Sequence, residues 1–197
     1  MSSAEHPVAE HPVAESLALV GREVAGVLEQ LVQGNQQALD ALAALLADAP
    51  RVFVLGAGRS GLALSMTAMR LMHLGLTVHV VGEVTAPAIG TGDLLLTASG
   101  SGTTHTIVRA AQLATDAGAT VAAISTTDSS PLADLAECVV VVAAAGKTDR
   151  SREASEQYAG GLFEQAVVLL GDALFHALWM RSGASADDLW PRHANLE

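Results

Sequence analysis

A cluster of hydroxyl side chains and glycines is the strongest chemical signal in the sequence. The segment Ser99-Gly100-Ser101-Gly102-Thr103-Thr104 offers four hydroxyls and two glycines between an apolar run and a helical pattern. Glycines let the backbone turn sharply, and the free amides and dipole of a helix N-terminus favour an anion. No Gly-Lys-Ser/Thr ending follows, so this is not a nucleoside-triphosphate loop. We predict a phosphate-binding loop; the alternative, an ordinary helix cap, would need only one hydroxyl.

A second glycine-rich turn, Gly56-Ala57-Gly58-Arg59-Ser60-Gly61, also follows an apolar run. It fits the Gly-x-Gly-x-x-Gly pattern of dinucleotide folds, and Glu83 stands roughly where such folds place an acidic residue. Arg59 and Ser60, however, place a cation and a hydroxyl at a helix start, which suits a terminal phosphate or a sugar hydroxyl. We therefore favour a sugar phosphate here, with dinucleotide binding and a turn whose glycines serve packing as the alternatives.

Two further residues are of types that move protons. Glu164 stands in a largely apolar helical stretch, where a carboxylate is unusual, so we take it as a candidate base. The alternative is a carboxylate that caps the helix or lies at an interface. His193 stands beside Arg192 in a C-terminal tail, which could supply an imidazole to move protons between oxygens or to open a ring. The alternative for His193 is a tail anchor that only packs. His73, inside a Leu/Met-rich helix, reads as a satisfied core or interface histidine.

Two basic side chains could supply positive charge near these groups. Arg59 and Lys147 could neutralise a phosphate or a developing oxyanion. Lys147 follows the last predicted strand, on the edge of the sheet where ligands gather in such folds. Ser60 and the loop of residues 99–104 are the firmer candidates for binding.

The elements that would position these residues alternate along the chain. Near-continuous apolar strands separated by helices predict a parallel sheet covered on both faces, a three-layer αβα sandwich of flavodoxin type. The five predicted strands are 51–55, 77–81, 93–98, 120–125 and 138–142. Helices are predicted over 16–47 with a break near Gly34, from the second glycine turn to 74, and over 104–117, 131–135, 156–181 and 186–189.

Domain organisation is simple. The first residues hold a Glu-His-Pro-Val-Ala repeat at 5–9 and 10–14, whose prolines interrupt helix formation. We predict a disordered tail over 1–15 and one domain over 16–197, without a linker. A length of 197 residues suits a single core.

Composition excludes several classes of partner. The net charge of −11 argues against nucleic acid or an anionic membrane as the main partner. We expect no apolar stretch to reach the roughly 20 residues of a membrane span. The N-terminal residues do not resemble a secretory signal, so the expected location is the cytoplasm. The single cysteine, Cys138, allows no intrachain disulfide and reads as a buried structural thiol.

Several motifs together resemble the sugar isomerase (SIS) domain family, most closely its 6-phospho-3-hexuloisomerases. They are the two loops above, Ala68-Met69-Arg70-Leu71-Met72-His73-Leu74-Gly75, Val81-Gly82-Glu83, Gly92-Asp93-Leu94-Leu95, Gly161-Leu162-Phe163-Glu164-Gln165 and Arg192-His193-Ala194-Asn195-Leu196-Glu197. The resemblance implies the SIS fold and interconversion of 3-hexulose 6-phosphate and fructose 6-phosphate, in formaldehyde fixation by the ribulose monophosphate route. It also implies no metal or organic cofactor and a homotetramer with active sites between subunits.

The implied reaction moves a carbonyl between C3 and C2. A base must take the C2 proton, and the enediol is reprotonated at C3. The resemblance places that base at Glu164. His193 is our second catalytic candidate, supplied by a tail that folds over a neighbouring subunit's site. Two alternatives stay open: an isomerase of the arabinose 5-phosphate type, and a non-catalytic sugar-phosphate sensor. The sensor is disfavoured because the chain is acidic, shows no helix-turn-helix appendage and retains Glu164.

Overall fold

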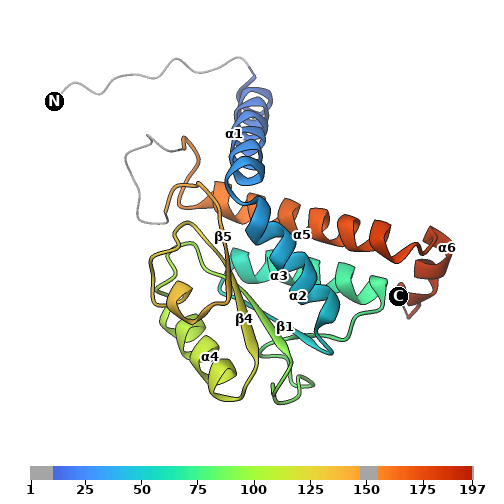
Figure 1. The fold of residues 1–197 in the computed structure, drawn as a ribbon. Helices are drawn as coiled ribbons and strands as arrows, with labels where there is room; N and C mark the ends of the chain where they lie inside the picture. Colours follow the sequence, from blue (N-terminus) through green and yellow to red (C-terminus); the bar gives the residue numbers. More distant parts are fainter. Residues whose placement is uncertain (1–10, 147–154, 197) are drawn as a thin grey trace.

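A five-stranded parallel sheet in the order β2-β1-β3-β4-β5 forms the centre of the protein (Figure 1). The structure is a computed structural model that describes residues 11–146 and 155–196. This strand order is that of flavodoxin-like doubly wound sheets, so the predicted fold class is confirmed. All five predicted strands are present, as β1 (Val52–Gly56), β2 (Val78–Val80), β3 (Leu94–Ala98), β4 (Thr120–Ser125) and β5 (Cys138–Val141).

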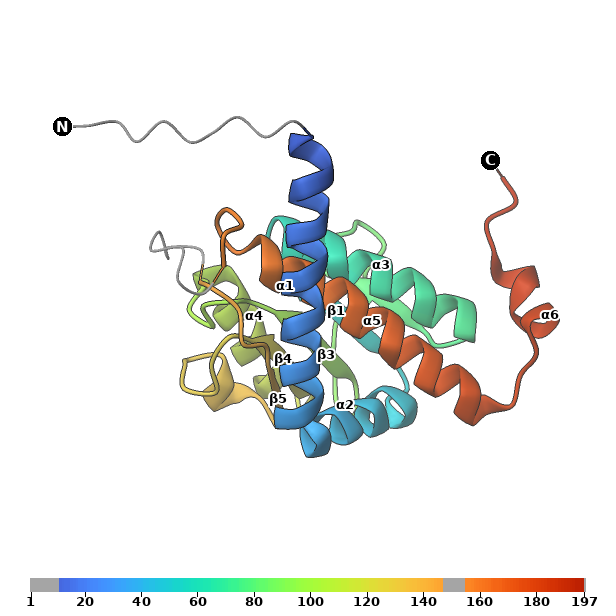
Figure 2. The same ribbon diagram turned by 90° about the horizontal axis from the view of Figure 1, so that it is seen from above.

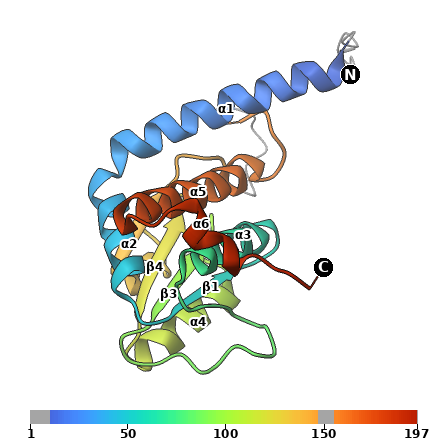
Figure 3. The ribbon, with the colours of Figure 1, turned by 90° about the vertical axis from the view of Figure 1, so that its right-hand side faces the viewer.

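Helices cover the two faces unequally (Figures 1 and 3). Alternate residues of each strand point to opposite faces. Val52 and Val54 of β1 join one core cluster with the larger helical layer, whereas Phe53 joins a second cluster with α4. The larger layer holds α1 (Pro12–Gly34), α2 (Gln36–Asp48), α3 (Arg59–Leu74) and α5 (Gly161–Ser182), and the other holds α4 (His105–Asp116) and a short 3-10 helix (Ala133–Leu135).

The N-terminal helix starts earlier than the sequence indicated. It begins at Pro12, inside the stretch 1–15 that was expected to be disordered, because proline is well tolerated in the first turn of a helix. The predicted break near Gly34 is present, and Asn35 explains it. The Asn35 side chain accepts from the Val141 amide at 2.8 Å and donates to the Val141 carbonyl at 2.9 Å. The first helical segment therefore ends where it is tied to strand β5.

Helix α5 is the longest element of the larger layer after α1, and it packs beside α3 (Figure 2). It starts at Gly161 rather than near 156, because Ala159 and Gly160 have positive φ angles of 49° and 80°. Among the described helices, α5 has the length and composition of a membrane span, so the expectation that no apolar stretch is long enough was wrong. Half of that apolar stretch is buried inside the protein, as in the core helix of a globular domain.

The chain ends in α6 (Ala186–Leu189) and a short 3-10 helix (Trp190–Arg192), which return to the C-terminal end of α3. A capping box at α6 joins Ser185 and Asp188, with the Asp188 amide 3.2 Å from Ser185 Oγ. The tail is therefore a folded element that lies at the opposite end of α3 from Arg59.

Candidate active site

Two loops meet where the sheet changes winding direction. Strands β1 and β3 are neighbours, yet α3 packs on one face and α4 on the other. Ligands of doubly wound folds bind in the crevice at the carboxyl ends of such a strand pair. The loop after β1 is the glycine turn of residues 56–61, and the loop after β3 is the hydroxyl loop of residues 99–104. The topology thus brings both predicted anion-binding loops to one edge.

The hydroxyls of the second loop are arranged in two pairs. Ser99 Oγ lies 3.1 Å from Thr104 Oγ1, and Thr103 Oγ1 donates to Ser101 Oγ at 3.0 Å. Ser99 is buried, while Ser101 and Thr103 are exposed to an incoming ligand. Thr104 is the N-cap residue of α4 but makes no side-chain cap bond among the described residues. The ordinary-cap alternative is therefore not what the structure shows, and the first amides of α4 remain available to an anion.

Strand β4 holds this loop in shape. The Gly100 carbonyl accepts from the Thr126 amide at 3.0 Å, the Thr126 hydroxyl at 2.7 Å and the Ser125 hydroxyl at 3.2 Å. Gly102 has a φ of 62°, and a Cβ atom there would overlap Ser130 Oγ. Only glycine combines that conformation with that contact. The loop is thus preorganised before any ligand arrives.

The glycines of the first loop serve packing, as one alternative proposed. A Cβ at Gly56 would lie 2.7 Å from the Gly61 amide nitrogen, so strand β1 and helix α3 meet backbone to backbone. This close approach places Arg59 at the first position of α3. Ser60, the second residue of α3, is buried against the same turn.

Glu164 lies in the first turn of α5 with only 5% of its surface exposed. Its Oε2 atom accepts a hydrogen bond from Nε of Arg59, whose side chain is 66% exposed. A Cβ atom added at Gly100 of the hydroxyl loop would lie 3.5 Å from the ring of Phe163, the residue that precedes Glu164. The first loop is therefore joined to the start of α5 by the Arg59–Glu164 pair, and the hydroxyl loop lies near Phe163 in the same turn of the helix.

An open cavity of ≈ 560 Å³ extends from this carboxylate. It is lined by Arg59, Gln157, Tyr158, Ala159, Gly161, Glu164 and Gln165. A site with a buried carboxylate, a cation and a nearby anion-binding loop fits proton transfer on a phosphorylated substrate. Of the described residues, no group of three or more His, Cys, Asp or Glu side chains is arranged to hold a metal ion.

His193 lies elsewhere in the same chain. Its ring stacks on His73 at 4.0 Å between centroids and also lies 4.8 Å from the ring of Trp190. Arg192 donates to the His73 carbonyl at 3.2 Å. These contacts are at the C-terminal end of α3, whereas Arg59 is at its N-terminal end. One chain therefore does not bring His193 to Glu164, and Lys147 lies outside the described residues.

His73 is buried, with 5% exposure, but it is not the satisfied histidine that the sequence suggested. Its Nδ1 atom has no hydrogen-bond partner among the described residues. Burial lowers the pKa of His73, and the neighbouring His193 and Arg70 lower it further. The His73 ring, at the end of α3, is thus kept neutral at neutral pH beneath the tail.

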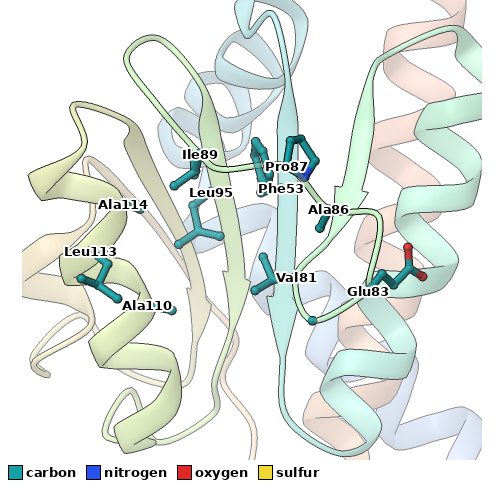
Figure 4. Close-up of a pocket in the computed structure, with 11 residues that line it drawn as sticks. Phe53, Val81, Glu83, Ala86, Pro87, Ile89, Leu95, Ala110, Leu113 and Ala114 are labelled. Atoms are coloured by element: carbon teal, nitrogen blue, oxygen red, sulfur yellow. The ribbon is translucent and has the colours of Figure 1, made fainter.

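A second hollow, of ≈ 290 Å³, lies on the α4 face of the sheet. Figure 4 shows its mainly apolar lining, including Phe53, Leu95 and Leu113, with the Glu83 carboxylate at the edge and turned away from them. Such a lining offers nothing to a phosphate. Glu83, which the dinucleotide alternative would use as its acidic residue, therefore stands apart from the cavity at Glu164.

Cys138 is buried, as predicted, and its Sγ donates to the Ala38 carbonyl at 3.3 Å. Burial raises the pKa of the Cys138 thiol, which leaves it unreactive.

Sequence reasoning missed the polar residues behind Glu164. Gln165 Nε2 donates to Gln157 Oε1 at 2.9 Å, and Gln157 Nε2 donates to Glu23 on α1 at 2.9 Å. Gln165 was noticed as part of a motif, but Glu23 and Gln157 carry no local signal. Glu23 is one of several charged residues on a long helix.

Comparison with known proteins defines the class first. The family model of the SIS domain matches residues 45–156, which run from the end of α2 to just before α5. Together with the doubly wound sheet and the hydroxyl loop, this match makes the protein a SIS domain protein.

The particular branch follows from its relatives. The 3-hexulose-6-phosphate isomerase of Mycobacterium gastri is 52% identical over 182 residues, covering 92% of this chain and 90% of that protein. The enzyme of the same name from Bacillus subtilis is 36% identical over 165 residues, covering 83% and 88%. A solved structure from Methanococcus jannaschii, for which a function of 3-hexulose-6-phosphate isomerase was inferred, superposes with a TM-score of 0.80 at 26% identity, covering 93% and 99%. The chain belongs to the 3-hexulose-6-phosphate isomerases of the SIS family, and it is an isomerase.

Proposed function

We propose that this isomerase interconverts D-arabino-hex-3-ulose 6-phosphate and fructose 6-phosphate through a cis-enediol, with Glu164 as the base. The observation that carries the proposal is the buried Glu164 carboxylate, which accepts a hydrogen bond from Arg59 of the first loop, at the sheet edge where the hydroxyl loop also lies. Relatives named for this reaction match nearly the whole chain. The reaction belongs to the ribulose monophosphate route of formaldehyde fixation.

The proton steps can be written on this site. Glu164 takes the proton from C2 of the 3-ketose, and the electrons of the C2–H bond form the C2=C3 double bond. The C3 carbonyl oxygen becomes an oxyanion, which the Arg59 guanidinium stabilises before it is protonated. His193 carries the proton between the oxygens: the C3 oxygen receives a proton from it, and the C2 hydroxyl returns one to it. C3 then receives the proton held by Glu164, and the carbonyl stands at C2.

The hydroxyl loop holds the phosphate at the far end of the sugar. Ser101 and Thr103 present exposed hydroxyls, and the Ser99–Thr104 pair lies beside the first amides of α4. Ser60 and Lys147 complete the binding set. Neither the chemistry nor these side chains call for a metal or an organic cofactor.

The oligomer is part of this proposal. Exposed apolar side chains follow one another along α3, among them Leu62, Met66 and Met69, and an assembly would cover them. We assign a homotetramer with active sites between subunits, in which the tail of one subunit brings His193 to the Glu164 of another to move protons between oxygens. The location is the cytoplasm. Light scattering of the purified protein measures the mass, and a monomer would contradict this arrangement.

A coupled assay tests the reaction. The purified protein is given 3-hexulose 6-phosphate, and fructose 6-phosphate is detected as it forms. We expect turnover that needs no added metal and persists in EDTA. Arabinose 5-phosphate serves as the comparison substrate; turnover of that sugar alone, or of neither, would contradict the proposal.

A further inference from the structure

Three hydrogen bonds from one short segment converge on a single carboxylate outside the site. Glu23, half-buried on α1, accepts from Ser155 Oγ at 2.7 Å, from the Glu156 amide at 2.8 Å and from Gln157 Nε2 at 2.9 Å. Ser155 Oγ also accepts from the Gln157 amide at 3.0 Å. Both oxygens of Glu23 are therefore engaged by the stretch 155–157.

The same segment continues into the wall of the cavity at Glu164. Gln157, Tyr158 and Ala159 all line that cavity. Gln157 Oε1 accepts from Gln165 Nε2 at 2.9 Å, and the Gln165 Oε1 atom is buried with no partner among the described residues. A continuous chain of hydrogen bonds thus runs from α1 through Gln157 to the residue next to Glu164.

This wall needs outside support. Residues 155–160 belong to no helix or strand, and Ala159 has a positive φ of 49°, which a residue with a side chain rarely adopts. Burial pushes the pKa of Glu23 upward, but the hydrogen bonds from Glu156, Gln157 and Ser155, together with the charge of Arg22, hold it below the usual value. Glu23 is therefore ionised at neutral pH, and hydrogen bonds to a charged acceptor are stronger than neutral ones.

We propose that Glu23 is a positioning residue that fixes the segment 155–159 as one wall of the substrate cavity. Through Gln157 it also orients the Gln165 side chain beside the catalytic carboxylate. The role in turnover rests on the proposed function, whereas the ordering of the segment does not. Helix α1 has its own apolar anchors in Val27 and Leu31, so loss of the Glu23 carboxylate leaves its docking in place.

The test compares Glu23→Ala with Glu29→Ala, which removes an exposed carboxylate from the same helix. Hydrogen exchange measured by mass spectrometry reports on residues 155–161 without any need for activity. We expect residues 155–161 to exchange faster in Glu23→Ala than in the wild type, and at the wild-type rate in Glu29→Ala. Unchanged exchange in Glu23→Ala would overturn the positioning role.

Steady-state kinetics on the sugar phosphate give the second readout. We expect the KM of Glu23→Ala to rise by roughly tenfold, as for the loss of a charge-assisted hydrogen bond, with a smaller change in kcat. Glu23→Gln keeps one acceptor oxygen and should recover part of the KM. If Glu23→Ala exchanges faster but keeps the wild-type KM and kcat, Glu23 orders the segment 155–159 without affecting the substrate cavity, and this would also overturn the proposal. A wild-type protein without turnover would contradict the proposed function. The exchange result would still test whether Glu23 orders the segment 155–159.

Discussion

The two ends of α3 carry polar clusters built on opposite principles. At the N-terminal end, Arg59 places a cation where the helix dipole disfavours one, and the buried Glu164 offsets it. At the C-terminal end, Arg192 donates to the His73 carbonyl, where the dipole favours a cation. The first cluster needs a charge from another helix, whereas the second is complementary to the helix itself.

This difference separates chemistry from anchoring. The Arg59 end gathers groups from the β1 and β3 loops and from α5, and it opens to a cavity. The other end is closed by one short segment of the tail, with the His73 and His193 rings stacked. Changes at the first end should therefore appear directly in turnover. Changes at the second should appear first in the docking of the tail and, through the proposed role of His193, in the turnover of a neighbouring subunit.

The largest expected effect is at Glu164. Glu164→Gln keeps the size of the side chain but removes the base, so kcat should fall by about 10²- to 10⁴-fold in the coupled assay. Asp172→Asn is the matched control, since it neutralises an exposed carboxylate on the same helix. Near-normal turnover of Glu164→Gln would remove Glu164 as the base.

The second effect concerns binding at the same end. Ser101→Ala combined with Thr104→Ala removes two hydroxyls of the phosphate loop, and KM for the sugar phosphate should rise by roughly tenfold or more. Thr115→Ala, which removes a hydroxyl bonded to Ala111 near the other end of α4, is the control. If KM does not change in the double variant, the phosphate binds elsewhere.

Features encoded by neighbouring residues could be predicted from the sequence, whereas contacts between distant residues could not. The strands were predictable because five apolar runs alternate with helices, and the two loops because their glycines and hydroxyls are consecutive. Glu164 was found because a carboxylate in an apolar helix is unusual. The contacts of Glu23, and of His73 with His193, join residues more than a hundred positions apart, and no local pattern encodes them. The start of α1 was missed because proline at a first turn looks like a helix breaker.

The third effect is at the tail. Arg192→Ala removes the bonds to the carbonyls of His73, at 3.2 Å, and Asp188, at 3.1 Å. Docking of the tail should weaken by about 1–2 kcal/mol, which hydrogen exchange over residues 186–196 measures. Arg181→Ala, at an exposed position in the last turn of α5, is the control. Equal exchange in the two variants would show that Arg192 does not anchor the tail.

The smallest effect is a dependence on pH at the same place. The pKa of His73 is lowered, first by burial and then by the charges of His193 and Arg70, from an ordinary value of 6.5. A group with a lowered folded-state pKa contributes stability above its unfolded pKa and loses it as the pH falls through the folded value. After correction for the intrinsic pH dependence of amide exchange, the protection of the tail should therefore decrease as the pH falls below 6.5. His73→Phe keeps a ring against His193 but cannot titrate, so the loss of protection should be smaller; an equal loss would assign the pH response to another group.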